Sequence, residues 1–159
     1  MPTALPSGLL LRPAQHQDLG AIRWLVLGAK LDPTQLRWSQ FWVIEHAEQV
    51  IACGQLRSFP AAQELGSLVV AKHWRRQGLG SALTQHLIQQ ATEPLYLECL
   101  GSTLAQFYQR LGFQPVSWQK LPRSLQRKFG LSAVAARFGF PVFLMHYDPS
   151  QNSAANHTE

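Results

Sequence analysis

The stretch that decides the fold runs from Glu64 to Thr84 and reads ELGSLVVAKHWRRQGLGSALT. Its first third is short, apolar and rich in β-branched residues, a pattern typical of a buried strand. A basic turn follows, after which apolar residues recur with helical spacing at Leu79, Leu83 and Leu87. The stretch therefore predicts a strand, a loop that contains glycines, and a helix.

The loop before this helix suits an anion. The N–H groups of a first helical turn have no intrahelical partner, and the helix dipole places partial positive charge there. Gly78 and Gly80 lack the Cβ atoms that would hold a phosphate away from the backbone, and Arg75 and Arg76 add full positive charges. The expected ligand is a phosphate or a pyrophosphate.

The spacing of the glycines separates the known kinds of phosphate-binding loop. A Walker loop ends in glycine, lysine and a serine or threonine, and this stretch has no such ending. A dinucleotide fingerprint needs a third glycine where Leu83 stands, and its glycines follow the strand directly rather than after residues 72–77. Neither pattern describes the segment Arg75–Gly80.

That segment, RRQGLG, resembles the R/Q-x-x-G-x-G/A pyrophosphate loop of the GNAT family of N-acetyltransferases. A second segment, FYQRLGF at Phe107–Phe113, is similar to the family's Y-x-x-x-G-F signature and follows a predicted strand at residues 95–100. The resemblance extends over about residues 9–145. It implies acetyl-CoA as the cosubstrate and an amine as the acceptor.

The resemblance also implies an α/β fold: one domain over residues 9–147, with a mixed, mostly antiparallel central sheet flanked by helices. The sequence departs from the family's minimal plan after Phe113. Apolar residues between Leu121 and Phe138, interrupted at Gly130, indicate two short amphipathic helices. This insertion, about residues 120–139, precedes the last strand. Residues 1–8 are expected to be loose, and residues 148–159 to form a disordered tail.

Periodicity and capping residues predict the other elements. Asp32 followed by Pro33 predicts the start of a second short helix, and Ser102 or Thr103 is expected to cap the fourth. Helices are expected at residues 15–30, 34–39, 80–91 and 103–111, and strands at 9–12, 40–45, 50–59, 64–70, 95–100 and 140–147.

The composition limits the function classes. The chain has 159 residues, 46% of them hydrophobic and 14% charged, as in an ordinary globular protein. The net charge of +5 comes from scattered basic residues without a continuous tract, so nucleic acid is not an expected partner. Cys53 and Cys99 lie in strand-like segments, and no cluster has metal-ligand spacing. No apolar run approaches the length of a membrane span, and a cytoplasmic location is expected.

The resemblance implies where acetyl-CoA binds. Main-chain groups of Leu68, Val69 and Val70 are expected to run alongside the pantetheine, and the N–H of Val69 or Val70 to polarise the thioester carbonyl. The pyrophosphate is expected on Arg75, Arg76, Gln77, Gly78, Leu79, Gly80 and Ser81.

Tyr108 is the expected general acid, because a phenol with a pKa near 10 is protonated at pH 7 and can give its proton to a departing thiolate. The alternative is an aromatic residue that only packs. The amine must also lose a proton, and Glu64 matches the place where several family members keep a glutamate base. Its alternatives are a solvated strand end, Glu98 as the base, or a water relay. His46, His73 and His86 are expected at the surface.

Two regions are candidates for acceptor contact or regulation. Arg37, Trp38 and Trp42 border the family's acceptor site, although packing explains the tryptophans equally well. The insertion carries Arg123, Arg127, Lys128 and Arg137, and its roles remain open between a lid, a dimer contact, a basic face toward a membrane or acidic partner, and a solvated surface.

The sequence thus predicts an N-acetyltransferase that moves acetyl from acetyl-CoA to a primary amine of a peptide, protein or small molecule by direct attack in a ternary complex. A non-catalytic acyl-CoA-binding module is the alternative. A homodimer is compatible with the sequence, which does not define the oligomeric state.

Overall fold

The computed structural model describes residues 4–149 of the chain, and these fall into two units. Unit 1 comprises residues 1–57 and 65–90, and unit 2 comprises residues 58–64 and 91–159. Strand β4 (Ala62–Val70) contributes its first residues to unit 2 and the rest to unit 1. Residues 1–3 of the predicted loose start and residues 150–159 of the predicted tail lie outside the described residues.

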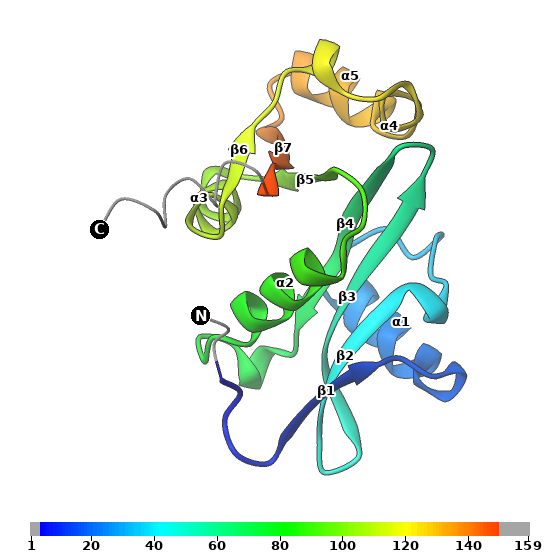
Figure 1. Ribbon diagram of the computed structural model, residues 1–159, viewed down its shortest axis with the longest axis vertical. Helices are drawn as coiled ribbons and strands as arrows, with labels where there is room; N and C mark the ends of the chain where they lie inside the picture. Colours follow the sequence, from blue (N-terminus) through cyan, green and yellow to red (C-terminus); the bar gives the residue numbers. More distant parts are fainter. Residues whose placement is uncertain (1–3, 150–159) are drawn as a thin grey trace. The chain divides into compact units, whose positions relative to one another are not determined.

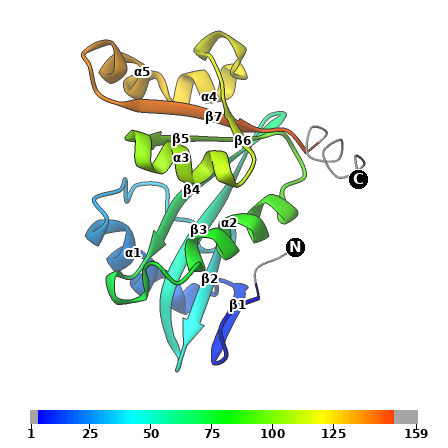
Figure 2. The same cartoon turned by 90° about the vertical axis from the view of Figure 1, so that its left-hand side faces the viewer.

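Unit 1 is a sheet with a helix on each face (Figures 1 and 2). Strand β1 (Leu9–Pro13) pairs antiparallel with β2 (Phe41–His46), which pairs antiparallel with β3 (Gln49–Phe59). The helices are α1 (Leu19–Gly28) and α2 (Leu79–Gln90). Three short 3-10 turns complete the unit: η1 (His16–Asp18), η2 (Trp38–Gln40) and η3 (Lys72–Trp74).

Successive side chains of each strand point to opposite faces of the unit 1 sheet, and each face packs against one helix. Helix α1 buries Ile22 and Val26 in a cluster with Phe41 of β2. On the other face, a Cβ on Gly54 would lie 2.8 Å from Leu87 Cδ1 of α2, closer than side-chain atoms approach. The missing side chain on β3 therefore lets α2 pack directly on the sheet.

Unit 2 continues from the first residues of β4. Gln63 and Glu64 pair in parallel with Leu95 and Tyr96 of β5 (Leu95–Leu100). Strand β5 pairs antiparallel with β7 (Val142–Tyr147), which pairs antiparallel with β6 (Phe113–Pro115). The hydrogen-bonded order of the seven strands is β1-β2-β3-β4-β5-β7-β6, a mixed and mostly antiparallel sheet. The predicted α/β class is confirmed.

Helices also cover both faces of the unit 2 strands (Figure 2). Helix α3 (Ser102–Arg110) lies on one face, and α4 (Arg123–Lys128) and α5 (Gly130–Arg137) lie on the other, after the short turn η4 (Trp118–Lys120). Leu125 and Phe129, both fully buried, pack with Tyr96. Two short helices thus stand where the insertion was predicted, and the break between them falls at Phe129.

The structure differs from the prediction at the second helix and at the start of α3. No α-helix forms at residues 34–39, because the Asp32 carboxylate accepts hydrogen bonds from the Thr34 N–H (2.9 Å) and Oγ1 (2.7 Å) and closes a turn instead. Only the 3-10 turn η2 overlaps the predicted range. Neither Ser102 nor Thr103 caps α3, whose first residue follows Gly101 at a φ of 87°. The short strand β6 was not predicted.

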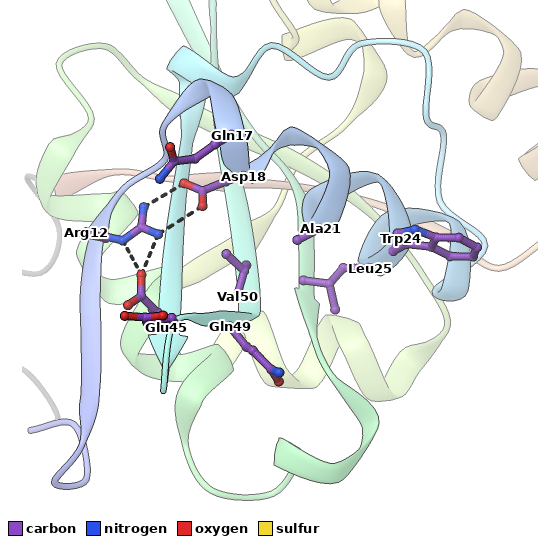
Figure 3. A pocket seen from close by; sticks show the side chains of 10 residues that line it. Arg12, Gln17, Asp18, Ala21, Trp24, Leu25, Glu45, Gln49 and Val50 are labelled. Carbon is purple, nitrogen blue, oxygen red and sulfur yellow. Dashed lines mark hydrogen bonds and ion pairs between the residues drawn. The ribbon is translucent and has the colours of Figure 1, made fainter.

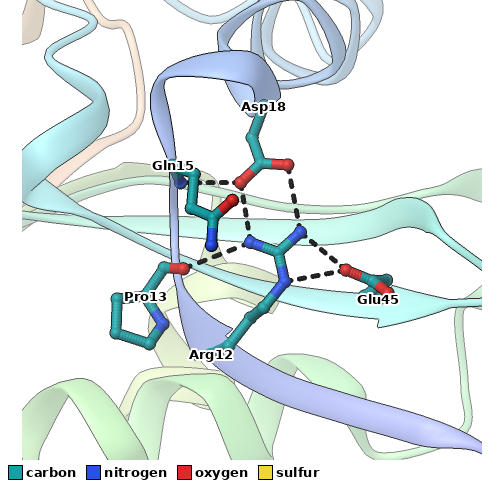
Figure 4. A network of polar contacts seen from close by, with 5 residues as sticks. All are labelled: Arg12, Pro13, Gln15, Asp18 and Glu45. Carbon is teal, nitrogen blue, oxygen red and sulfur yellow. Dashed lines mark hydrogen bonds and ion pairs between the residues drawn. The ribbon is translucent and has the colours of Figure 1, made fainter.

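Helix α1 begins later than its periodicity indicates, because Asp18 is engaged elsewhere (Figure 4). Arg12 Nη1 and Nη2 donate to the two Asp18 oxygens at 2.7 and 3.0 Å, and Arg12 Nε donates to Glu45 at 2.7 Å. The Gln15 N–H also donates to Asp18, at 2.7 Å. This network joins β1, η1 and β2, and the Arg12 hydrogen bonds hold the pKa of Asp18 below its ordinary value.

Among residues 4–149, no helix has both the length and the apolar character needed to cross a membrane.

The Asp18 network predicts a pH-dependent contribution to stability. Asp18→Asn should lower the free energy of unfolding at pH 7 by about 2 kcal/mol, because Asp18 is 6% exposed and Arg12 loses its bidentate partner. The folded pKa lies below the ordinary 3.8, so the stabilisation is present above pH 3.8 and is lost as the pH falls through the folded value. Urea unfolding should show the difference from wild type shrinking in acid. An equal loss at all pH values, or the same effect from Glu93→Gln at the surface, would refute this account.

Candidate functional site

The loop between β4 and α2 has the backbone that an anion-binding helix start requires. Gly78 adopts a φ of 79° and Arg76 a φ of 62°, both in the left-handed region. Helix α2 begins at Leu79, and its first hydrogen bond runs from the Ala82 N–H to the Gly78 oxygen at 3.0 Å. The earlier N–H groups of the turn therefore stand at the positive end of a twelve-residue helix.

The residues of this loop differ in how far their side chains are exposed, and this difference shows which residue anchors the helix and which are open to a ligand. Leu79 is 1% exposed and fixes the helix start against the core. Gly80 and Ser81 are half-buried, whereas residues 75–78 are exposed. Arg75 Nε donates to the Val70 oxygen at 3.0 Å and so ties the loop to the end of β4. The predicted phosphate loop and the predicted pantetheine strand thus meet within unit 1.

Strand β4 is irregular just before the residues predicted to line the pantetheine. Ser67 adopts a φ of 49°, an outlier for a non-glycine residue within a strand. Such a residue breaks the alternation of a strand and bends it, as bulges do next to active sites. The main-chain groups of Leu68, Val69 and Val70 follow this bend.

A buried polar cluster holds Ser67, and sequence reasoning missed it. Arg57 Nη2 donates to Ser67 Oγ at 3.1 Å, and Ser67 Oγ lies 3.4 Å from Gln55 Oε1. Gln55 is fully buried and Arg57 is 8% exposed. The Arg57 guanidinium occupies the space of a Cβ at Gly66. The signal was a glutamine and an arginine two residues apart on one face of a largely apolar strand.

Tyr108 lies on α3, inside the hydrophobic layer of unit 2. It is 6% exposed, and its ring packs edge-on against Phe113 with 5.6 Å between centroids. Burial, together with the neighbouring Cys99, raises the pKa of Tyr108 above its ordinary value. The phenol is therefore neutral at pH 7, as a proton donor must be.

Glu64 is not a solvated strand end, because it is 2% exposed. Its carboxylate forms an ion pair with Lys128 of α4, whose side chain is 16% exposed. The Lys128 ammonium also lies over two aromatic rings, 5.9 Å from the centroid of Phe59 and 5.6 Å from that of Phe129. The insertion thus supplies the cation of a largely buried pair with the predicted base.

Glu64 and Tyr108 lie on opposite faces of the unit 2 strands. Glu64 is in register with Tyr96, which packs under α4. Tyr108 neighbours Cys99, and strand alternation places Cys99 on the face opposite to Tyr96. Glu98 is half-buried, pairs in register with Leu144, and shares the face of Tyr96. The two carboxylates predicted as alternative bases therefore share one face, away from the predicted acid.

The histidines differ in exposure. His73 is exposed, and the ring of His46 lies 4.7 Å from that of Trp74. His86 is half-buried against Trp42, with ring centroids 4.1 Å apart, and burial lowers its pKa. His46 is half-buried as well, so the surface prediction holds fully only for His73. Trp42 packs under α2.

Unit 1 also holds a cavity of about 860 Å³ beside α1 (Figure 3). Its polar wall is the Arg12, Asp18 and Glu45 network, whose charged groups bind one another, and its far end carries Trp24. None of the predicted site residues lines it. In residues 4–149, no group of three or more histidine, cysteine, aspartate or glutamate residues is arranged to hold a metal ion.

Comparison with known proteins agrees with this geometry. The family model described as an acetyltransferase (GNAT) domain matches residues 37–115, which contain β2 to β6, the loop and Tyr108. N-acetyltransferase 8B of Rattus norvegicus is 29% identical over 119 residues, 66% of this chain and 52% of the relative. Residues 37–115 of the chain thus match the GNAT acetyltransferase domain. The chain spans about half the length of this curated relative.

Solved structures share the fold. N-acetylglutamate synthase from Neisseria gonorrhoeae, in complex with coenzyme A and L-arginine, superposes with a TM-score of 0.70 at 20% identity, covering 89% of this chain and 34% of the synthase. The Mycobacterium tuberculosis protein Rv2747, in complex with CoA and NLQ, gives a TM-score of 0.68 at 19% identity, covering 87% of this chain and 98% of the other.

The ion pair of Glu64 with Lys128 predicts a strong effect of its disruption. Lys128→Met should lower the free energy of unfolding by on the order of 2–3 kcal/mol at pH 7, because it removes the Lys128 ammonium from a buried carboxylate.

The matched control for this prediction is the double variant Glu64→Leu with Lys128→Met, which removes both charges and should recover most of the stability. Urea unfolding of the wild type, both single variants and the double variant gives the coupling energy. Additive effects of the two substitutions would show that the pair does not anchor α4.

Proposed function

We propose that this protein transfers an acetyl group from acetyl-CoA to a primary amine by direct attack in a ternary complex. The observation that carries the proposal is the RRQGLG loop at the start of α2, with left-handed backbone at Arg76 and Gly78. The match of residues 37–115 to the GNAT acetyltransferase domain supports it. So do the two solved proteins of the same fold, both in complex with coenzyme A.

The residues of unit 1 fit a diphosphate. The first-turn N–H groups of α2 face it, Arg76 adds a charge, and Gly78 provides a conformation that residues with a Cβ rarely adopt. The main chain of Leu68, Val69 and Val70, after the bend at Ser67, would accompany the pantetheine. Acetyl-CoA supplies the thioester, and the N–H of Val69 or Val70 would polarise its carbonyl.

Two side chains of unit 2 would move protons. Tyr108 would give its hydroxyl proton to the departing sulfur, and Glu64, directly or through a water molecule, would take a proton from the amine nitrogen. Glu98 remains the second candidate for the base. A base acts on the attacking group and an acid on the leaving group, and both groups are bonded to one carbon in the tetrahedral intermediate. Because Glu64 and Tyr108 lie on opposite faces of the strands, the role proposed for Glu64 is best served by a water molecule that relays the proton.

One observation favours a second candidate function, a non-catalytic acyl-CoA-binding module. Tyr108 is packed among aromatic rings and Glu64 is paired with Lys128, so both have a structural use without catalysis. Calorimetric titration with acetyl-CoA, followed by a thiol-release assay over a panel of amines and peptides, separates the two functions. Binding without thiol release for any amine would establish the module.

The acceptor is either an amine of a peptide or protein or a small molecule. The expected setting is the cytoplasm, where a reducing medium keeps thiols such as the buried Cys53 and Cys99 free. A homodimer remains compatible with this proposal.

The first test concerns the backbone at Gly78. Gly78→Ala should weaken acetyl-CoA binding on the order of tenfold, because a φ of 79° costs a residue with a Cβ about 1–2 kcal/mol. The space around its Cβ is open, so the effect should come from conformation and not from a clash. Gly28→Ala in α1 is the matched control, since its Cβ also meets open space. Equal affinities for wild type and Gly78→Ala would exclude this loop as the diphosphate site.

The second test concerns the proton donor. Tyr108→Phe keeps the ring and its packing, and should lower kcat on the order of 100-fold while leaving acetyl-CoA affinity unchanged. Tyr96→Phe, a buried tyrosine on the other face, is the control and should leave kcat unchanged. Steady-state kinetics with calorimetric titration measures both quantities. If Tyr108→Phe turns over like wild type, Tyr108 only packs.

A further inference from the structure

Helix α5 presents an apolar face to solvent. Leu131, Val134 and Phe138 recur at helical spacing and are 87%, 51% and 80% exposed. Phe140, just beyond the helix, is 61% exposed. Single exposed apolar side chains are common on protein surfaces, but several of them gathered on one face usually mark a docking surface.

The end of α5 fixes the two phenylalanines of this face. The Phe140 N–H donates to the Ala135 oxygen at 3.3 Å and the Gly139 N–H donates to the Ala136 oxygen at 3.1 Å, the pair of hydrogen bonds of a Schellman motif. Gly139 provides the φ of 88° that this motif requires. Phe138 and Phe140 are therefore held on an ordered helix end.

The charged residues of the segment that carries this face are all of one sign. Residues 115–147 contain no aspartate or glutamate. Their exposed basic residues are Lys120, Arg123, Arg127 and Arg137. Arg123 and Arg127 are one turn apart on α4, whose buried Leu125 and Phe129 attach it to the strands. The two neighbouring helices of unit 2 thus combine exposed apolar residues on α5 with exposed basic residues on α4 and α5.

We propose that this face, formed by the apolar residues of α5 with Phe140 and by the exposed basic residues of η4, α4 and α5, binds the surface of an anionic lipid bilayer. Apolar and aromatic side chains beside exposed arginines and lysines are the composition of helices that lie in the bilayer interface. Each basic residue near an anionic leaflet strengthens binding.

Charge and shape oppose the other occupants. Two copies of this chain meeting through the same face would bring their exposed basic residues together, and like charges repel. Residues 150–159 contain no large apolar side chain that could cover the exposed apolar residues. A partner helix needs a groove, whereas Leu131 and Phe138 project at more than three-quarters exposure. A bilayer interface requires only projecting apolar groups and positive charge.

The test is co-sedimentation of the full chain with vesicles of phosphatidylcholine alone and of phosphatidylcholine mixed with phosphatidylglycerol. The wild type should bind the anionic vesicles, and salt should weaken the binding. The double variant Phe138→Ser with Phe140→Ser should reduce partitioning on the order of tenfold or more. Arg123→Gln and Arg127→Gln should each reduce it about fivefold.

The matched control is the double variant Trp24→Ser with Leu27→Ser. It removes two exposed apolar side chains of α1, which are 79% and 52% exposed respectively. It should bind like wild type. Unfolding curves and acetyl-CoA titration of each variant separate lost binding from lost folding. The proposal fails if the wild-type protein does not bind anionic vesicles. It also fails if salt weakens the binding but the phenylalanine substitutions leave it unchanged, because that result indicates a site that binds any polyanion. It also fails if sedimentation velocity shows a dimer that the phenylalanine variant dissociates.

Discussion

The candidate site depends on a constraint in the main chain, namely three residues in left-handed conformation, one within β4 and two in the loop before α2. Ser67, Arg76 and Gly78 lie within twelve residues of one another, and two of them carry a Cβ. Conformations of this kind persist only where surrounding contacts stabilise them. For Ser67 those contacts are the buried Gln55 and Arg57. Polar groups in the core of unit 1 thus shape the strand that leads to the loop.

The sequence predicted the features that depend on residues close together in the chain. The glycines and arginines of the loop, the periodicity of α2 and the two helices of the insertion are all legible within a few residues, and the structure has them. Local chemistry also explains the failure at Asp32, whose carboxylate serves a turn as readily as a helix start. The polar cluster at Ser67 left only the spacing of Gln55 and Arg57 on one strand face as a sequence signal, and the contact of these residues with Ser67 depends on how two strands pair. The pair of Glu64 with Lys128 joins residues 64 positions apart, which no spacing in the sequence indicates.

The pair of Glu64 with Lys128 changes how the predicted base is understood. The Lys128 ammonium contacts the Glu64 carboxylate and lies over the rings of Phe59 and Phe129. Lys128 therefore helps to fix the orientation and the charge environment of Glu64. Since Lys128 belongs to the insertion, the segment that departs from the minimal family plan also determines the environment of a predicted catalytic residue.

The insertion gives its two helices opposite orientations toward solvent. Leu125 of α4 and Phe129, which follows α4, lie in the core, whereas the arginines of α4 are exposed. The apolar side of α4 is therefore covered within unit 2. Helix α5 follows without a linker, yet leaves Leu131 and Phe138 outside. An eight-residue helix gains little stability from its own hydrogen bonds, so its packing on the strands and its capped end must maintain it. Leu131 and Phe138 bury little surface within the fold, and binding to another surface is the physical use that we propose for them.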